Sequence, residues 1–230
     1  MIETHPPLRR VRWSTTCRIV PSRYPPVDLF ERVADPADWE VLAEIEGLTN
    51  DRLRDEMGDL CLVPTGDRIG GPGTSPVMAS FTHIGFPSRF TDGSYGVYYA
   101  GARIEVALAE VAFHLTRFYS STDEPAFHSE HRAYLGKLDA SLHDIRGGWP
   151  QIHNPDSYRE SQALGRELRQ RGSNGVAYRS ARCRGGHCLA AFKPKTVGPV
   201  VQGPHFYFEW NGQVLTRYFR IGDDAWQPFC

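Results

Sequence analysis

The chain of 230 residues has almost no net charge and no long apolar run. Its 26 basic and 27 acidic residues give a formal net charge of −1 at pH 7. General nucleic-acid binding requires a basic face that displaces counterions, and this balance argues against one. No apolar run approaches the ~20 residues that span a bilayer, and the N-terminus lacks the apolar segment of a secretory signal. We therefore expect neither nucleic acid nor a membrane as a direct partner.

Cysteine is scarce and irregularly placed, at positions 17, 61, 183, 188 and 230. An odd, scattered set is a poor disulfide framework, so the sequence favours a reducing cytoplasm. The stretch CRGGHC (183–188) offers three metal ligands at an awkward spacing, whereas zinc prefers four. We expect no metal site.

Three familiar motifs are missing. The loop GGPGTS (70–75) lacks the lysine of a P-loop, and no GxGxxG follows a predicted strand. No GxSxG surrounds Ser180. These absences argue against a P-loop nucleotide site, a Rossmann cofactor site and a serine hydrolase.

Predicted strands and helices alternate without a regular βαβ pattern. Residues 77–83 fit either a strand or a short helix. We therefore predict an α+β fold, with a twisted sheet that is mainly antiparallel or mixed and is flanked by helices. The predicted strands are 15–20, 97–100 and 132–140 with hairpins at 175–192 and 206–219, and the predicted helices are 28–58 (broken near Pro36), 104–118 and 156–172.

The helix predicted over 104–118 carries polar side chains along one flank. Glu110 lies roughly 120° from the centre of the apolar stripe, and Arg103, His114 and Arg117 share its flank. Two interpretations fit: a cluster of surface ion pairs, or a flank that faces a pocket. The apolar stripe consists of Ile104, Leu108, Val111, Leu115 and Phe118.

Other polar residues are candidate ligand contacts. Arg89 precedes a glycine-rich turn and Tyr99 follows it; arginine offers planar donors to phosphate, and tyrosine offers a stacking face. Arg23 and Tyr24, between prolines, form a similar pair, and Ser180 lies among three arginines. Each has an ordinary alternative: a surface arginine, a core tyrosine or an exposed polar strand.

Two blocks of sequence carry a family resemblance. SRFTDGSYGVYYAGARIEVALAEVAFH (88–114) and GVAYRSARCRGGHCLAAF (175–192) together resemble the RES-domain toxins, which pair with Xre-type helix-turn-helix antitoxins in bacteria. The family is named for an Arg, a Glu and a Ser, and Arg89, Glu110 and Ser180 take those positions. The resemblance covers about residues 15–195 of a single domain, 1–230, in which the helical segment 28–58 is an insertion.

The tyrosine of the first block is ambiguous, because Tyr98 and Tyr99 are adjacent. An ungapped count back from Glu110 selects Tyr99. Arg23 and Tyr24 match the early arginine–tyrosine pair of the family, on the strength of a dipeptide alone.

The resemblance implies a fold similar to the ADP-ribosyltransferase toxins and a reaction on NAD⁺. NAD⁺ is then a consumed substrate and no cofactor is needed, which agrees with the missing dinucleotide motif. The bond between nicotinamide and ribose is broken, and the acceptor is water, phosphate or a protein side chain. The implied partner is an antitoxin, in a hetero-oligomer in the cytoplasm.

The chemistry of that bond assigns roles to the candidate residues. Glu110 would stabilise the developing positive charge on the ribose, and Arg89, with Arg23, would hold the pyrophosphate. Tyr99 and Tyr24 would stack on nicotinamide or order the ribose. Ser180 would hydrogen-bond either the nicotinamide side or a phosphate.

Two rival functions use the same residues. The first is a mono-ADP-ribosyltransferase that modifies a cellular protein. The second is a catalytically silent module that binds a nucleotide or an antitoxin without turnover. The transferase differs from hydrolysis in the fate of the adenylate half of NAD⁺, which ends on a protein. The silent module differs from both enzymes because it releases no nicotinamide.

Overall fold

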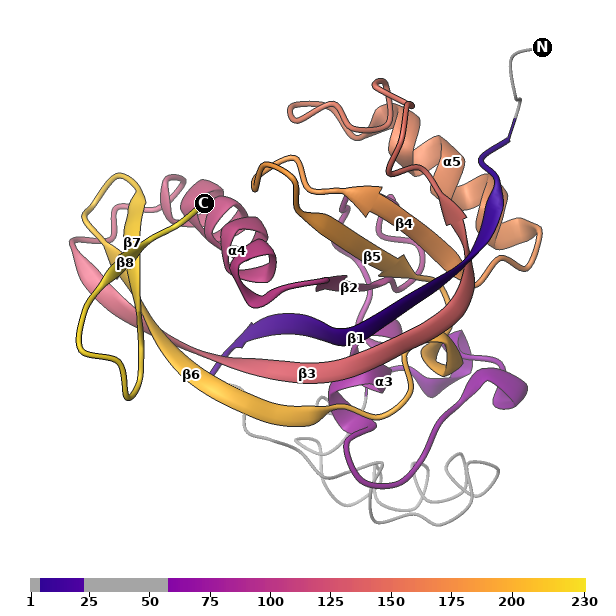
Figure 1. Ribbon diagram of the computed structural model, residues 1–230, viewed down its shortest axis with the longest axis horizontal. Helices are drawn as coiled ribbons and strands as arrows, with labels where there is room; N and C mark the ends of the chain where they lie inside the picture. The colour runs from indigo at the N-terminus through magenta and orange to yellow at the C-terminus, as the bar shows by residue number, and fades with distance from the viewer. Residues whose placement is uncertain (1–4, 23–57) are drawn as a thin grey trace.

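Three long antiparallel strands form the base of the fold (Figure 1). The computed structural model describes residues 5–22 and 58–230. β1 runs beside β3 from the pair Leu8–His143 to the pair Pro21–His131, and β3 also pairs with β6 on its other edge. The bounds of these strands are Leu8–Pro21 for β1, Phe127–Asp144 for β3 and Val201–Trp210 for β6.

Three short strands form a second layer above this base (Figure 1). β5 pairs antiparallel with both β2 and β4, and β4 pairs parallel with β3. A single pair, Cys17 with Gly101, joins β1 to β2. The sheet is therefore mixed, and the predicted α+β class is confirmed. The bounds are Tyr98–Gly101 for β2, Gly175–Arg179 for β4 and His187–Ala191 for β5.

Both predicted hairpins are present in the structure. β4 and β5 turn at Gly185 and Gly186, and β6 is followed by β7 (Leu215–Arg220) across the Asn211–Gly212 turn. The short strand β8 (Gln227–Pro228) then pairs with β7. β4 ends at Arg179, so Ser180 lies in the connection between the two strands and not in an exposed polar strand.

Helices cover the sheet at three places. α4 (Ile104–Tyr119) packs on β1, β2, β5 and β7, and α5 (Arg159–Gln170) packs on β4. The third helix is α3 (Ser75–Thr82), so the segment 77–83, which fitted either a strand or a short helix, is helical up to Thr82. Short 3₁₀ turns occupy Leu60–Leu62, Thr65–Asp67 and Pro194–Thr196. The helical segment predicted at 28–58 lies outside the described residues except for its last position.

The predicted apolar stripe of α4 is buried except at its end. Leu108 is 1% exposed, and Ile104, Val111 and Leu115 pack against the same core cluster, whereas Phe118 is 57% exposed. The buried face is wider than the stripe, because Val106 and Ala109 pack in a second cluster. Glu110 and Val111 line a cavity.

The structure contains one disulfide among the described cysteines, between Cys183 and Cys230. The expectation of a poor disulfide framework is wrong for this pair. The two residues are 47 positions apart, and the C-terminal segment returns across α4 to the β4–β5 connection (Figure 1). Cys17, Cys61 and Cys188 are free.

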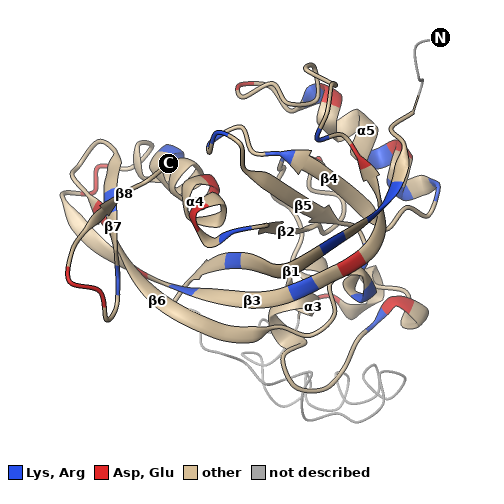
Figure 2. Ribbon diagram, viewed as in Figure 1, with Lys and Arg blue, Asp and Glu red and all other residues tan. Residues whose placement is uncertain are grey.

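Charged residues of both signs are interspersed over the described elements (Figure 2). On β1 and β3, Arg10 and Arg12 contact Asp139 across the strand pair. α5 carries Glu160 in its first turn and Arg169 in its last turn. Of the helices in the described residues, none has both the length and the apolar character needed to cross a membrane.

Candidate functional site

A cavity of about 280 Å³ lies between β1, β2, α4 and β5, beside the segment 87–89. The cavity lies where the two blocks of sequence that carry the family resemblance meet. The block 88–114 supplies β2 and most of α4, and the block 175–192 supplies β5. The polar side chains that line it include those of Arg18, Arg89, Tyr99, Glu110, His114 and Cys188.

Glu110 is oriented by Ser180. The Ser180 hydroxyl donates to Glu110 Oε1 over 2.5 Å, a length typical of a charge-assisted bond. The same hydroxyl accepts from the backbone N–H groups of Arg182 at 3.0 Å and Cys183 at 2.9 Å. Two donors and one acceptor therefore fix the position of the hydroxyl, and its O–H bond points toward the carboxylate.

A buried thiol also faces the carboxylate. Burial raises the pKa of Cys188 well above its usual value, so the thiol is protonated at pH 7, and its Sγ lies 3.9 Å from Glu110 Oε1. Both hydrogen bonds to Glu110 from described residues thus end on Oε1. This leaves Oε2 free for a ligand in the cavity.

Arg89 is buried, at 5% exposure, rather than on the surface. Its Nη1 donates to the carbonyl oxygens of Ile152 at 3.2 Å and Asn154 at 3.0 Å, and its guanidinium stacks 4.6 Å from the ring of Tyr158. Its Nη2 is buried with no hydrogen-bond partner among the described residues. A buried unpaired donor on a cation is costly, so this atom is a strong candidate for contact with an anionic ligand.

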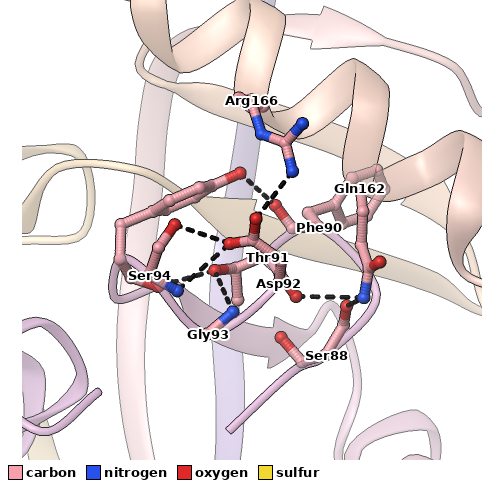
Figure 3. A network of polar contacts seen from close by, with 9 residues as sticks. Ser88, Phe90, Thr91, Asp92, Gly93, Ser94, Gln162 and Arg166 are labelled. Atoms are coloured by element: carbon pink, nitrogen blue, oxygen red, sulfur yellow. Dashed lines mark hydrogen bonds and ion pairs between the residues drawn. The ribbon is translucent and has the colours of Figure 1, made fainter. Parts of the chain in front are cut away.

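The loop that carries Arg89 is fixed from α5 (Figure 3). Gln162 donates to the carbonyl oxygens of Ser88 at 2.9 Å and Thr91 at 3.1 Å, and Arg166 pairs with Asp92 at 2.6 Å. Gly165 allows this close approach, because a Cβ at that position would collide with the carbonyl of Phe90. The loop is therefore held by its backbone as well as by its side chains.

The two adjacent tyrosines have different environments. Tyr98 is fully buried in the core, whereas Tyr99 lines the cavity. The hydroxyl of Tyr99 accepts from the backbone N–H of Phe90 at 2.9 Å and lies 2.8 Å from the hydroxyl of Ser88. Tyr99 is thus the cavity tyrosine, and it also fastens the loop on either side of Arg89.

Arg18 is a cavity residue that the sequence did not single out. It lies in the middle of β1, where its guanidinium is 4.9 Å from the ring of Tyr98 and its Nη1 donates to the carbonyl of Tyr99 at 3.3 Å. Burial lowers the pKa of Arg18, but a guanidinium remains charged at physiological pH. Its buried Nε has no hydrogen-bond partner among the described residues. The only sequence signal is a single cation within the apolar strand CRIV.

His114 follows Glu110 by one turn of α4 and lines the same cavity. Burial and the guanidinium groups of Arg182, Arg117 and Arg89 lower the pKa of His114 to about 4. However, His114 is exposed to solvent, which screens some of this effect. The direction nevertheless favours neutral imidazole at pH 7, which presents one donor and one acceptor to a ligand.

The structure brings together four of the six predicted site residues. Arg89, Tyr99 and Glu110 line the cavity and Ser180 contacts Glu110. Of the polar flank of α4, Glu110 and His114 line this cavity, whereas Arg103 and Arg117 do not. The predicted residues Arg23 and Tyr24 lie outside the described ranges. Within those ranges, no three His, Cys, Asp or Glu side chains gather as metal ligands.

Comparison with known proteins shows what this chain is similar to. The sequence model of the RES domain family matches residues 67–211, which include both resembling blocks. The uncharacterized protein y4oC of Sinorhizobium fredii is 27% identical over 207 residues, which are 90% of this chain and 87% of that protein. A chain of the M. tuberculosis MbcT–MbcA toxin–antitoxin complex matches with a TM-score of 0.44 and 12% identity, over 92% of this chain and 86% of that one.

Proposed function

The chain belongs to the RES domain family, and from this premise we propose that it is the toxin of a toxin–antitoxin pair and cleaves the nicotinamide–ribose bond of NAD⁺. One observation supports the proposal most: a carboxylate with a free oxygen and a buried arginine with an unpaired donor line the same cavity of about 280 Å³. A cation-stabilising group beside an anion-binding group suits a substrate that develops a cation next to its phosphates.

Glu110 acts on the ribose. The bond between the anomeric carbon and the nicotinamide nitrogen breaks, and its electron pair leaves with nicotinamide, which departs neutral and needs no general acid. The ribose becomes an oxocarbenium-like cation. Oε2 of Glu110, left free by Ser180, binds the ribose hydroxyls and stabilises this charge.

Arg89 and Arg18 bind the anionic part of the substrate. Nη2 of Arg89 and Nε of Arg18 are buried donors without partners among the described residues. Pyrophosphate oxygens satisfy both, and an arginine held by its other nitrogens binds them with little loss of conformational entropy. This fixes the dinucleotide while the glycosidic bond breaks.

Ser180 and Tyr99 are positioning residues in this proposal. The Ser180 hydroxyl is committed to Glu110 and to two backbone N–H groups, so it orients the carboxylate instead of contacting nicotinamide or phosphate. The Tyr99 hydroxyl is committed to the Arg89 loop, which leaves its ring face for the substrate.

The acceptor completes the reaction at the anomeric carbon. Water gives ADP-ribose and a proton, and phosphate gives ADP-ribose 1″-phosphate. No described carboxylate other than Glu110 lines the cavity, so we propose a small, freely diffusing acceptor. We further propose that an Xre-type antitoxin binds the chain and that the reaction takes place in the cytoplasm.

Purified protein and NAD⁺, in buffers with and without phosphate, test this proposal. We expect release of nicotinamide, with loss of release in Glu110→Ala and with the co-product identifying the acceptor. NAD⁺ labelled in its adenylate half reports the rival transferase, because its label would appear on protein. Binding of NAD⁺ with no nicotinamide release from the unmodified chain would instead support the silent binding module.

A further inference from the structure

A second hollow adjoins the cavity of Glu110. It has a volume of about 690 Å³ and lies between the end of α4 and the start of α5. Its lining includes Pro87, Arg117, Tyr158, Arg159 and Gln162. Gln162 and Tyr158 support Arg89, and none of these residues contacts the substrate in the proposed cleavage.

The two spaces are joined through shared residues. Pro87 lines both of them, and α4 contributes His114 to the cavity and Arg117, one turn later, to the hollow. Arg89 lines the cavity while its guanidinium stacks on Tyr158, which lines the hollow. Arg89 therefore lies at the junction.

The cavity is too small for a whole dinucleotide. Sites for drug-sized ligands have volumes of ~300–1,000 Å³, and the cavity, at about 280 Å³, falls just below this range. A dinucleotide consists of two nucleotide halves joined by a pyrophosphate. If one half fills the cavity and the pyrophosphate meets Arg89 at the junction, the other half enters the hollow.

The charge of the hollow suits a phosphorylated ligand. Arg166 is neutralised by Asp92 at 2.6 Å, and Arg159 contacts Glu160 only at 3.8 Å with both side chains exposed, a pair of little strength. Arg117 has no ion pair among the described residues. Asp156 is the one carboxylate among the described lining residues, so two weakly engaged arginines outnumber it.

We propose that this hollow is the adenylate subsite, which takes the adenosine monophosphate half of the dinucleotide while the nicotinamide half lies beside Glu110. This inference rests on the proposed function for the identity of the dinucleotide. Arg117 and Arg159 contact the adenylate half, and Tyr158, one face of which is covered by Arg89, offers the other face to it.

Binding measurements by calorimetry test the subsite in the full chain carrying Glu110→Ala, which prevents turnover. NAD⁺, AMP and nicotinamide mononucleotide are titrated into this parent and into the parent with Arg117→Ala and Arg159→Ala added. Arg171→Ala is the matched control. Arg171 is an exposed arginine that directly follows α5, the helix that begins at Arg159, and it pairs with Glu167 outside the hollow. Thermal unfolding checks that each protein is folded.

We expect the double variant to bind NAD⁺ and AMP at least about tenfold more weakly, a loss of ~1.4 kcal/mol, and to bind nicotinamide mononucleotide as the parent does. The Arg171→Ala control should bind all three ligands as the parent does. Unchanged affinity for NAD⁺ and AMP would overturn the proposal. So would an equal loss for the mononucleotide, or a parent that binds NAD⁺ no more tightly than the mononucleotide.

The proposed function is tested apart from this, by nicotinamide release from the unmodified chain. If the affinities change as expected and no nicotinamide is released, the cleavage fails and the adenylate subsite stands. If nicotinamide is released and the double variant binds all three ligands as the parent does, the subsite fails and the cleavage stands.

Discussion

Arg89 and Glu110 line one cavity, but the fold supports them in different ways. Arg89 is held by two backbone carbonyls and an aromatic ring, on a loop that α5 fastens through Gln162. Glu110 depends on one strong hydrogen bond, from Ser180. The cationic side is thus anchored by main chain, and the anionic side by one hydroxyl and the weaker contact of the Cys188 thiol. This difference predicts that substitutions on the two sides change different kinetic constants.

The largest expected effect is on the anionic side, where Glu110→Gln keeps the shape of the side chain and removes its charge. We expect kcat for nicotinamide release to fall by about a thousandfold, because the developing cation loses its electrostatic partner. The affinity for NAD⁺, measured by calorimetry, should remain close to that of the unmodified protein. Turnover near the unmodified rate would refute the role of this carboxylate.

On the cationic side, Arg89→Lys keeps the charge and loses the planar group that reaches two carbonyls and a ligand together. We expect KM for NAD⁺ to rise by about 10-fold to 100-fold, with a smaller change in kcat. Steady-state kinetics on both variants give the comparison directly. A change in kcat alone would mean that Arg89 acts in the bond-breaking step and not in binding.

Ser180→Ala removes the hydrogen bond that orients the Glu110 carboxylate and leaves the carboxylate itself in place. A hydrogen bond to a charged group contributes ~1.5–3 kcal/mol, so we expect kcat to fall by about 10-fold to 100-fold with KM nearly unchanged. Ser180→Thr keeps the hydroxyl and should restore most of the rate. Thermal unfolding of both variants shows whether the loop has been lost. A rise in KM that exceeds the fall in kcat would place Ser180 on the substrate instead.

The sequence predicted much of the sheet but few of the contacts that hold Arg89 and Glu110 in place. Alternation and turn residues located the hairpins, and the two blocks placed Arg89, Glu110 and Ser180 in one site. The partners of those residues are remote in sequence: Ser180 is 70 positions from Glu110, and the carbonyls that hold Arg89 are 63 and 65 positions away. Backbone carbonyls carry no signature in residue type, so no motif reveals them.

Two further differences have the same origin in packing. The predicted stripe of α4 ends at Phe118, which is exposed, and the buried face of the helix also includes Val106 and Ala109, which pack in a second core cluster. The sequence did not single out Arg18 on β1, which the fold places beside Tyr99. Both depend on how elements distant in sequence meet, which local periodicity does not contain.

The smallest expected effect on activity concerns the disulfide, which fastens the loop that holds Ser180. Cys183 donates its backbone N–H to the Ser180 hydroxyl, and its side chain is joined to Cys230. In Cys230→Ser the backbone bonds to Ser180 remain, so we expect kcat and KM to be nearly unchanged. The free energy of unfolding should fall by about 2–4 kcal/mol, because the unfolded chain loses a cross-link.

Thermal unfolding of Cys230→Ser in oxidising buffer measures this loss, which amounts to roughly 4–16 °C in Tm for a chain of this size. The unmodified protein in dithiothreitol should unfold at the temperature of the variant, and the variant should not respond to dithiothreitol. Equal Tm values without reductant would mean that the cross-link does not form. A fall in kcat at constant KM would show that the anionic side needs the cross-link as well as the hydroxyl, and the contrast with the backbone-anchored cationic side would then be greater.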